Sequence, residues 1–176
     1  MVNLYVDVKG VEEVINSFEM SIKDTNIATK RAMKRTLDWI RSKSVKEISV
    51  QTGIQARELR KRFKIKVKSN GLSGVVWYGI LPVSLIHLKP KKTKTGIKAG
   101  IRGQIVRQGA FIAPRRSGDS VLQVYKRTGS TRFPIDKQTE IIKTDVQTFI
   151  SKIKPELEKK LLNELRHQLK WQATRT

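Results

Sequence analysis

Residues 59–118 contain fifteen lysines and arginines and no carboxylate, in a chain of 176 residues with a formal net charge of +22. Such side chains can neutralise phosphate, because Lys and Arg release the counterions condensed on a polyanion. Like charge without relief repels itself in a compact protein, so we expect a polyanion or an acidic partner protein beside this segment. The cations are Arg60, Lys61, Arg62, Lys64, Lys66, Lys68, Lys89, Lys91, Lys92, Lys94, Lys98, Arg102, Arg107, Arg115 and Arg116.

Six of these cations lie in the segment Lys89–Arg102, which has three interpretations. It is a solvated loop, a contact for an acidic protein surface, or a contact for the phosphate backbone of DNA, which we favour. It has no aromatic residue on which bases could stack, which argues against a platform for single strands. Trp77 and Tyr78 lie in a nearby predicted strand, where aromatic residues more often belong to the core. The residues predicted to contact DNA or an acidic partner are Lys89, Lys91, Lys92, Lys94, Lys98 and Arg102.

The sequence contains no motif that indicates catalysis. Asp136 and Glu140 could share one turn of a helix, but carboxylates at that spacing are usually just solvated. There is no phosphate-binding glycine loop and no nucleophile elbow. The chain has no cysteine and two distant histidines, His87 and His167, which disfavours a metal centre. We therefore predict no enzymatic activity, no cofactor and no metal.

The segment Lys46–Arg62 superficially resembles a helix-turn-helix. In that interpretation a short helix would present Gln55, Arg57 and Arg60 to base edges in the major groove of DNA. The alternative is a simple connection between two helices, which is common. The preceding helix is also longer than the compact motif uses, so the second interpretation is preferred.

The elements that must position these residues follow from hydrophobic periodicity. The N-terminal third predicts a strand, an amphipathic helix and a long basic helix that ends at Thr52-Gly53. Either Thr25 or Asn26 could cap the long helix. A compact helix and a strand with one apolar and one cationic face come next. The predicted ranges are a strand over 2–8, a helix over 11–22, a helix to about Val50, a helix over 55–62 and a strand over 63–68.

Asn70-Gly71 predicts a hairpin whose second strand runs over 72–81. Residues 89–100, KPKKTKTGIKAG, lack periodicity and predict an exposed, mobile loop. Two antiparallel strands are expected over 101–112 and 121–127, with a turn at 115–119. A helix is expected over 144–171, and Pro155 should either kink it or begin a second helix. The leucines that step by four along this helix are Leu157, Leu161, Leu165 and Leu169.

Helical ends around a basic centre of strands define an α+β fold. We expect a single domain over 1–176, with parts at 1–62, 63–136 and 137–176. No run of eighteen apolar residues is present, so no membrane span is expected.

The segment Gln108–Asp136, together with LLNELRHQL at 161–169, resembles the minor tail protein Z family of tailed bacteriophages, the tail-completion proteins. The order of a helical N-terminal region, a basic middle and a Leu-rich last helix is similar as well. Pro134 restricts the backbone of Phe133, so we expect a turn that docks Phe133 and Ile135 into the core. The motif residues are Gly109, Ala110, Phe111, Ile112, Arg132, Phe133, Pro134, Ile135 and Asp136.

This resemblance implies a structural protein of the virion, assembled in the host cytoplasm. It implies a ring, expected to be a hexamer, at the head-proximal end of the tail, where head and tail join. The implied partners are tail terminator or tube proteins, head–tail connector proteins, further copies of the chain, and DNA phosphates without sequence preference. The competing hypothesis is a nucleic-acid-binding module, either a helix-turn-helix regulator or a ribosomal-type RNA binder.

Overall fold

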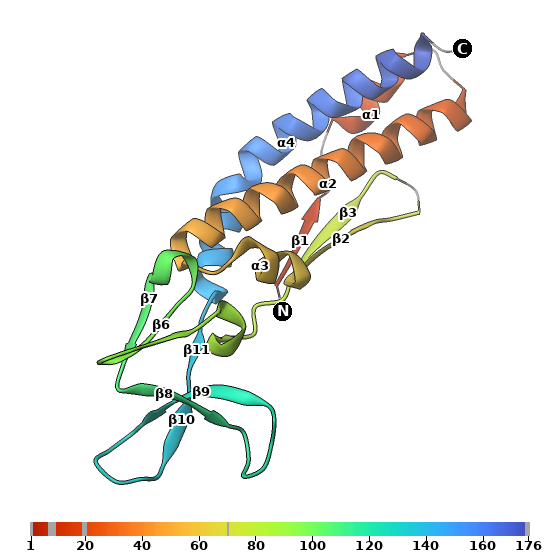
Figure 1. The fold of residues 1–176 in the computed structure, drawn as a ribbon. Helices are drawn as coiled ribbons and strands as arrows, with labels where there is room; N and C mark the ends of the chain where they lie inside the picture. The colour runs from red at the N-terminus through yellow and green to blue at the C-terminus, as the bar shows by residue number, and fades with distance from the viewer. Residues whose placement is uncertain (1, 7–9, 19–20, 70, 175–176) are drawn as a thin grey trace. The chain divides into compact units, whose positions relative to one another are not determined.

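The computed structural model describes residues 2–6, 10–18, 21–69 and 71–174. It combines helices with antiparallel sheets and confirms the α+β prediction (Figure 1). The helices are α1 (Val11–Asn16), α2 (Ile22–Thr52), α3 (Ala56–Arg62), η1 (Leu85–Leu88), η2 (Ile101–Gly103) and α4 (Lys143–Ala173). The strands are β1 (Val2–Val6), β2 (Phe63–Val67), β3 (Gly74–Tyr78), β4 (Val83–Ser84), β5 (Lys91–Thr93), β6 (Gly96–Ala99), β7 (Ile105–Gln108), β8 (Ala110–Pro114), β9 (Leu122–Arg127), β10 (Ile135–Lys137) and β11 (Thr139–Glu140).

The chain forms two compact units, which are described separately. The helical unit comprises Met1–Val45, Arg62–Gly79 and Gln147–Thr176. The strand unit comprises Lys46–Lys61 and Ile80–Val146. These boundaries cut across the three sequence parts expected above, and a single folding domain over 1–176 stays a prediction.

The helical unit contains an antiparallel sheet with the strand order β1-β3-β2. Period-two alternation places apolar side chains on one face, which α2 covers. Gly74 marks a close approach, because a Cβ at this position would lie 2.6 Å from Cδ1 of Leu37 on α2. The predicted hairpin between β2 and β3 is confirmed, although Asn70 lies outside the described residues. The buried residues of this face are Leu4, Val6, Phe63, Val76 and Tyr78.

Helix α2 begins earlier than predicted because Ser21 caps it. The Ser21 hydroxyl accepts a hydrogen bond from the backbone N–H of Asp24 at 3.2 Å and donates one to the Asp24 carboxylate at 2.5 Å. This reciprocal pair satisfies a free N–H of the first turn. The predicted cap at Thr25 or Asn26 is wrong, and so is the extension of the preceding helix to Ile22, whose side chain is 83% exposed. The predicted end at Thr52 is confirmed.

Helix α4 is one uninterrupted helix that includes Pro155, so no second helix begins there. Leu157, Leu161, Leu165 and Leu169 are all buried, as their spacing predicted. Leu165 and Leu169 join a cluster with α1 and α2 whose other buried members are Val14, Ala28 and Ala32. Polar contacts between α2 and α4 accompany this packing: Lys43 with Glu156, Arg35 with Glu164 at 3.9 Å, and Gln172 with Asp24 at 2.9 Å.

The strand unit is built from three small antiparallel sheets, with the orders β5-β6-β7, β10-β9-β8 and β11-β4. The buried side chains of Ser84 and Gln123 join two of them by a hydrogen bond of 2.8 Å. The backbone oxygen of Gly53, which follows α2, accepts a hydrogen bond from the N–H of Ile101 at 2.7 Å. The buried apolar residues of this unit include Ile54, Leu59, Val83, Leu85, Leu88, Ile97, Ile105, Val124 and Ile142.

Two predictions for the strand unit are wrong. Residues 89–100 are not a loop, because β5 and β6 pair within them. Residues 101–112 are not one strand, because η2 and Gly109, with φ of +70°, interrupt them. The predicted pairing across the turn at 115–119 is confirmed by β8 and β9. In the described ranges, no helix is long and apolar enough to cross a membrane.

Candidate nucleic-acid interface

The β5–β6 hairpin contains four of the six predicted contact residues, and three of them lie at paired positions. Lys91 lies directly opposite Lys98, and Lys92 lies opposite Ile97. Because neighbouring positions of a strand point to opposite faces, Lys91 and Lys98 share one face and Lys92 lies on the other. Lys94 occupies the turn. The hairpin therefore brings together Lys91 and Lys98, and both side chains are exposed.

The hairpin is anchored by small and apolar residues within the basic sequence. Ile97 and Ala99 are buried, whereas Lys98 between them is exposed. Gly96 has φ of +151°, and a Cβ there would lie 2.3 Å from the backbone oxygen of Arg107. The hydroxyl of Thr93 donates to the backbone oxygen of Gly96 at 3.1 Å. The short alternation in GIKA is the sequence signal that could have predicted this hairpin.

The remaining two predicted residues flank the hairpin. Lys89 follows η1 with φ of 53°, and Arg102 lies within η2 with φ of 51°. Both side chains are exposed. Gly103, next to Arg102, packs against Lys98, since a Cβ at Gly103 would lie 3.5 Å from Cβ of Lys98. The Arg102 segment therefore adjoins the face of Lys91 and Lys98.

Among the described residues, no carboxylate neutralises the positive charge of this face. The strand unit does contain ion pairs, such as Arg107 with Glu140 at 2.6 Å and Arg115 with Asp119 at 3.0 Å. Within the described ranges, none of the six predicted residues lies within 4.0 Å of a carboxylate in an ion pair. Like charges directly opposite each other destabilise a sheet. An external anion at Lys91 and Lys98 would remove that cost.

Sequence reasoning missed the ion pair of Arg107 and Glu140. Asp136 and Glu140 do not share a helical turn, because they lie on β10 and β11. Arg107 and Glu140 line a hollow of about 300 Å³, whose other walls are Val50–Gly53, Gln104 and Ile105. Since each charge of the pair offsets the other, this hollow offers no net charge to a ligand.

The first half of the family motif lies at the start of β8. Ala110 is buried, and Phe111 and Ile112 are half-buried. The guanidinium of Arg127 lies 5.6 Å from the ring centre of Phe111, and the Tyr125 ring lies 6.3 Å from it. A shallow hollow of about 360 Å³ separates this strand from the β5–β6 turn.

The second half of the motif does not anchor the core as expected. Phe133 is 62% exposed, and Ile135 is half-buried. The turn is held by polar bonds instead, because Thr131 donates to the backbone oxygen of Phe133 at 2.5 Å and Thr128 donates to that of Pro134 at 3.2 Å. The guanidinium of Arg132 lies 5.7 Å from the Phe133 ring centre. Phe133 is therefore a surface side chain.

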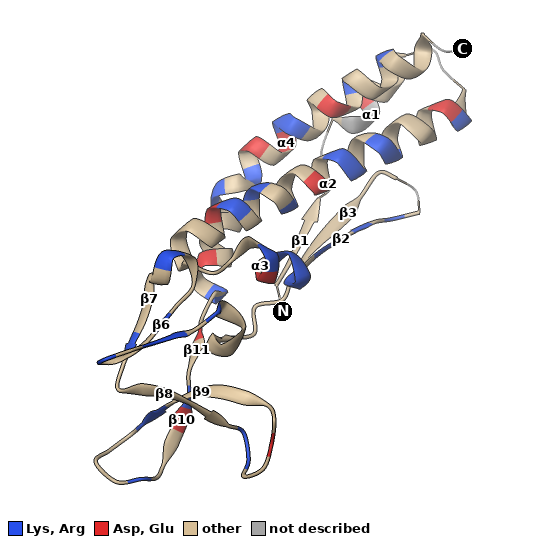
Figure 2. Ribbon diagram, in the orientation of Figure 1, with Lys and Arg blue, Asp and Glu red and all other residues tan. Residues whose placement is uncertain are grey.

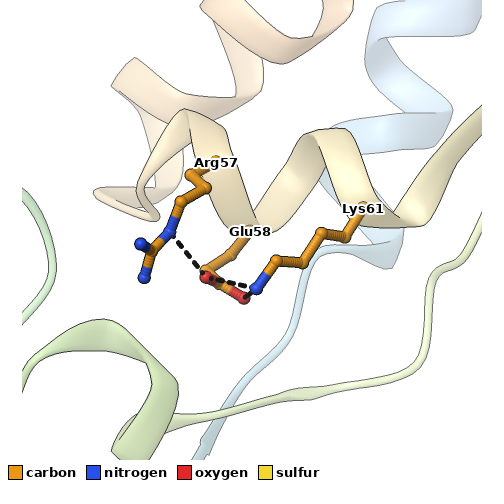
Figure 3. A network of polar contacts seen from close by, with 3 residues as sticks. All are labelled: Arg57, Glu58 and Lys61. Carbon is orange, nitrogen blue, oxygen red and sulfur yellow. Dashed lines mark hydrogen bonds and ion pairs between the residues drawn. The ribbon is translucent and has the colours of Figure 1, made fainter.

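Helix α3, the predicted recognition helix, uses two of its cations internally. Lys61 and Arg57 pair with the buried carboxylate of Glu58 at 3.0 and 3.3 Å (Figure 3). Burial opposes the charge of Glu58, but the hydrogen bonds and charges of Lys61 and Arg57 together outweigh it, so the pKa of Glu58 lies below its ordinary value. Arg57 is thus turned to Glu58, which favours the simple connection between helices over base readout.

The fold and its hairpin define a class: an α+β protein with an exposed basic hairpin. No group of His, Cys, Asp and Glu in the described ranges could hold a metal ion. Residues 8–75 match the family described as prophage minor tail protein Z (GPZ). This match supports the predicted resemblance at the level of the family and points to a structural role in a phage tail.

The matched segment covers less than half of the chain and includes α1, α2, α3 and β2. The motifs at 109–112, 132–136 and 161–169, on which the resemblance was based, lie outside it. No curated protein and no solved structure matches the chain.

Proposed function

We propose that this chain is a structural protein of the phage tail that forms a ring at the head-proximal end, mediates head–tail joining and contacts the DNA in the channel. The observation that carries the DNA contact is the pair of exposed lysines, Lys91 and Lys98, directly opposite each other on β5 and β6. The family match supports the tail, and the resemblance supports the neck position and the ring.

Phosphate is the anion that this face fits best. DNA that moves through a ring presents a repeating array of phosphates, and contacts to phosphates position the duplex without reading its sequence. The hairpin offers lysines and threonines but no aromatic residue, Asn or Gln for bases. Binding should therefore be insensitive to sequence and should weaken steeply with salt.

The partners in this proposal are other copies of the chain, expected as a hexamer, together with tail terminator or tube proteins and the head–tail connector. The virion is the proposed location, after assembly in the host cytoplasm. The same account proposes no enzymatic step.

The test replaces both lysines, as Lys91→Gln/Lys98→Gln in the full chain, and measures affinity for duplex DNA across salt concentrations. We expect the slope of log affinity against log salt to fall by about 1.8, since each phosphate contact contributes about 0.9. The matched control, Lys152→Gln/Lys154→Gln on α4, removes the same charge from an exposed helix surface. An equal effect of both variants would contradict a specific role for the hairpin.

A preference of the protein for one DNA sequence would distinguish the competing hypothesis, a helix-turn-helix regulator, from this proposal. Two duplexes of unrelated sequence and equal length should bind with the same affinity and the same salt slope. A strong preference for one duplex at physiological salt would instead support a helix-turn-helix regulator built on α3.

A further inference from the structure

The outer face of the β1-β3-β2 sheet combines aromatic and cationic side chains. Strand alternation places Tyr78 in the core and Trp77, its neighbour, on the opposite face. The rule that strand aromatics belong to the core therefore holds for Tyr78 and fails for Trp77. The register sets two rows across this face: Asn3, Trp77 and Lys64 in one, and Tyr5, Val75 and Lys66 in the other.

The two aromatic residues are diagonal neighbours on adjacent strands. Trp77 lies opposite Asn3, and Tyr5 is two residues further along β1, so their Cα atoms are about 7–8 Å apart. The Tyr5 side chain is 66% exposed. A Cβ at Gly79 would lie 3.0 Å from Cη2 of Trp77. Glycine at this position therefore leaves room for the indole ring beside the strand.

The cations form a line along one edge of the same face. Lys64 and Lys66 are exposed and about 6.7 Å apart along β2, and Lys68 continues the alternation beyond its end. Figure 2 marks the Lys and Arg positions of β2 in blue along the ribbon. Within the described ranges, none of the three has a carboxylate at ion-pair distance. The described residues of the face include no acid.

We propose that this face binds single-stranded nucleic acid, with bases stacked on Tyr5 and Trp77 and phosphates held along Lys64, Lys66 and Lys68. Base stacking on aromatic side chains beside a cationic track is the physical basis of sequence-tolerant single-strand binding. A duplex does not fit both features, because its base faces are already stacked inside the helix.

The test compares an oligothymidylate with a duplex of equal length, using fluorescence anisotropy and the full chain. We expect Tyr5→Ala to weaken single-strand binding about tenfold and to leave duplex binding unchanged, because stacking needs an unpaired base. Tyr5→Phe keeps the ring and should bind as the wild type does. Lys64→Gln/Lys66→Gln should lower the salt slope on the single strand by about 1.4, whereas Lys152→Gln/Lys154→Gln should not.

This proposal and the hairpin proposal fail separately. Lys91→Gln/Lys98→Gln should weaken the duplex and spare the oligothymidylate, whereas Tyr5→Ala should do the reverse. Unchanged single-strand affinity in Tyr5→Ala, or an equal loss on both ligands, would overturn the sheet proposal. If the sheet variants bind nucleic acid normally but fail to enter tails, the face docks a protein and the proposal is wrong.

Discussion

Tyr78 places a phenol hydroxyl in the core of the helical unit, at 0% exposure. Its ring contacts Phe63 edge-to-face, with 4.8 Å between ring centres. No protein group of the described chain satisfies the hydroxyl with a hydrogen bond of normal geometry. The nearby Ser44 hydroxyl donates instead to the backbone oxygen of Arg41 at 2.9 Å. Burial raises the pKa of Tyr78 from 10.0 to about 12, and the Ser44 hydroxyl offsets only part of that rise.

Tyr78→Phe should therefore raise the free energy of unfolding by about 1 kcal/mol at pH 7, because it removes a buried polar group without a partner. The folded-state pKa is raised, so the phenol of the unfolded chain ionises first, and the wild type loses stability as pH rises from 10 towards about 12. The advantage of the variant should grow over that window. Urea titrations of both proteins at pH 7 and above pH 10 measure it. Lower stability in the variant at pH 7 would show that the hydroxyl has a partner.

Glu58 contributes stability in the opposite pH range. Its folded-state pKa is depressed below 4.5, so its contribution is present above that pH and is lost as pH falls through the folded pKa. Glu58→Gln should cost about 1 kcal/mol at pH 7, since its partners Arg57 and Lys61 are solvent-exposed. The gap between variant and wild type in thermal melts should narrow as pH falls below 4.5. A gap that persists there would mean that charge pairing is not the cause.

At the scale of elements, the β5–β6 hairpin shows that a basic sequence can still be ordered. Ile97 is 1% exposed, whereas Phe133, in the turn before β10, is 62% exposed. The free energy of unfolding lost on truncating a side chain depends on how deeply that side chain is buried, and not on its hydrophobicity alone.

Ile97→Ala should lower the free energy of unfolding by about 2–4 kcal/mol, because it leaves a cavity under the hairpin. Phe133→Ala should change it by less than about 0.5 kcal/mol, because a surface side chain loses few contacts. Urea unfolding of the two variants compares them directly. Equal losses would show that Phe133 is buried, as the sequence first suggested.

Sequence periodicity predicted the elements whose pattern is long enough to be unambiguous. The alternation of Phe63, Ile65 and Val67 with lysines predicted β2, and the leucines at steps of four predicted α4. The β5–β6 hairpin was missed because its apolar pattern consists only of Ile97 and Ala99. The prediction that Phe133 is buried failed for another reason. Pro134 restricts the backbone of Phe133, but this restriction does not determine whether another element packs against the Phe133 ring.

The sequence predicted which residues make up the candidate site, but it did not predict how they are arranged in space. The sequence identified all six basic residues, yet only pairing between strands sets Lys91 opposite Lys98 and turns Lys92 to the other face. The aromatic face of the first sheet was missed for a similar reason. Adjacent residues Trp77 and Tyr78 look alike in sequence, and only the position of α2 decides which of them is buried.

At the scale of the whole molecule, the charge of +22 is concentrated where carboxylates are absent. The strand unit presents a lysine pair on a hairpin, and the helical unit presents a lysine row on a sheet. An isolated monomer must bear the repulsion within each surface, and a polyanion relieves it. The proposed contact with DNA would provide that relief.

The most direct test of this account is electron microscopy of tails from the phage that encodes the chain, with the gene present and with it deleted. The account predicts a ring of density at the head-proximal end that disappears on deletion, together with tails that no longer join heads to give infectious particles. Restoring the chain from a plasmid should return both the ring and infectivity. Infectious particles that form normally without the chain, or tails that never contain it, would contradict the account.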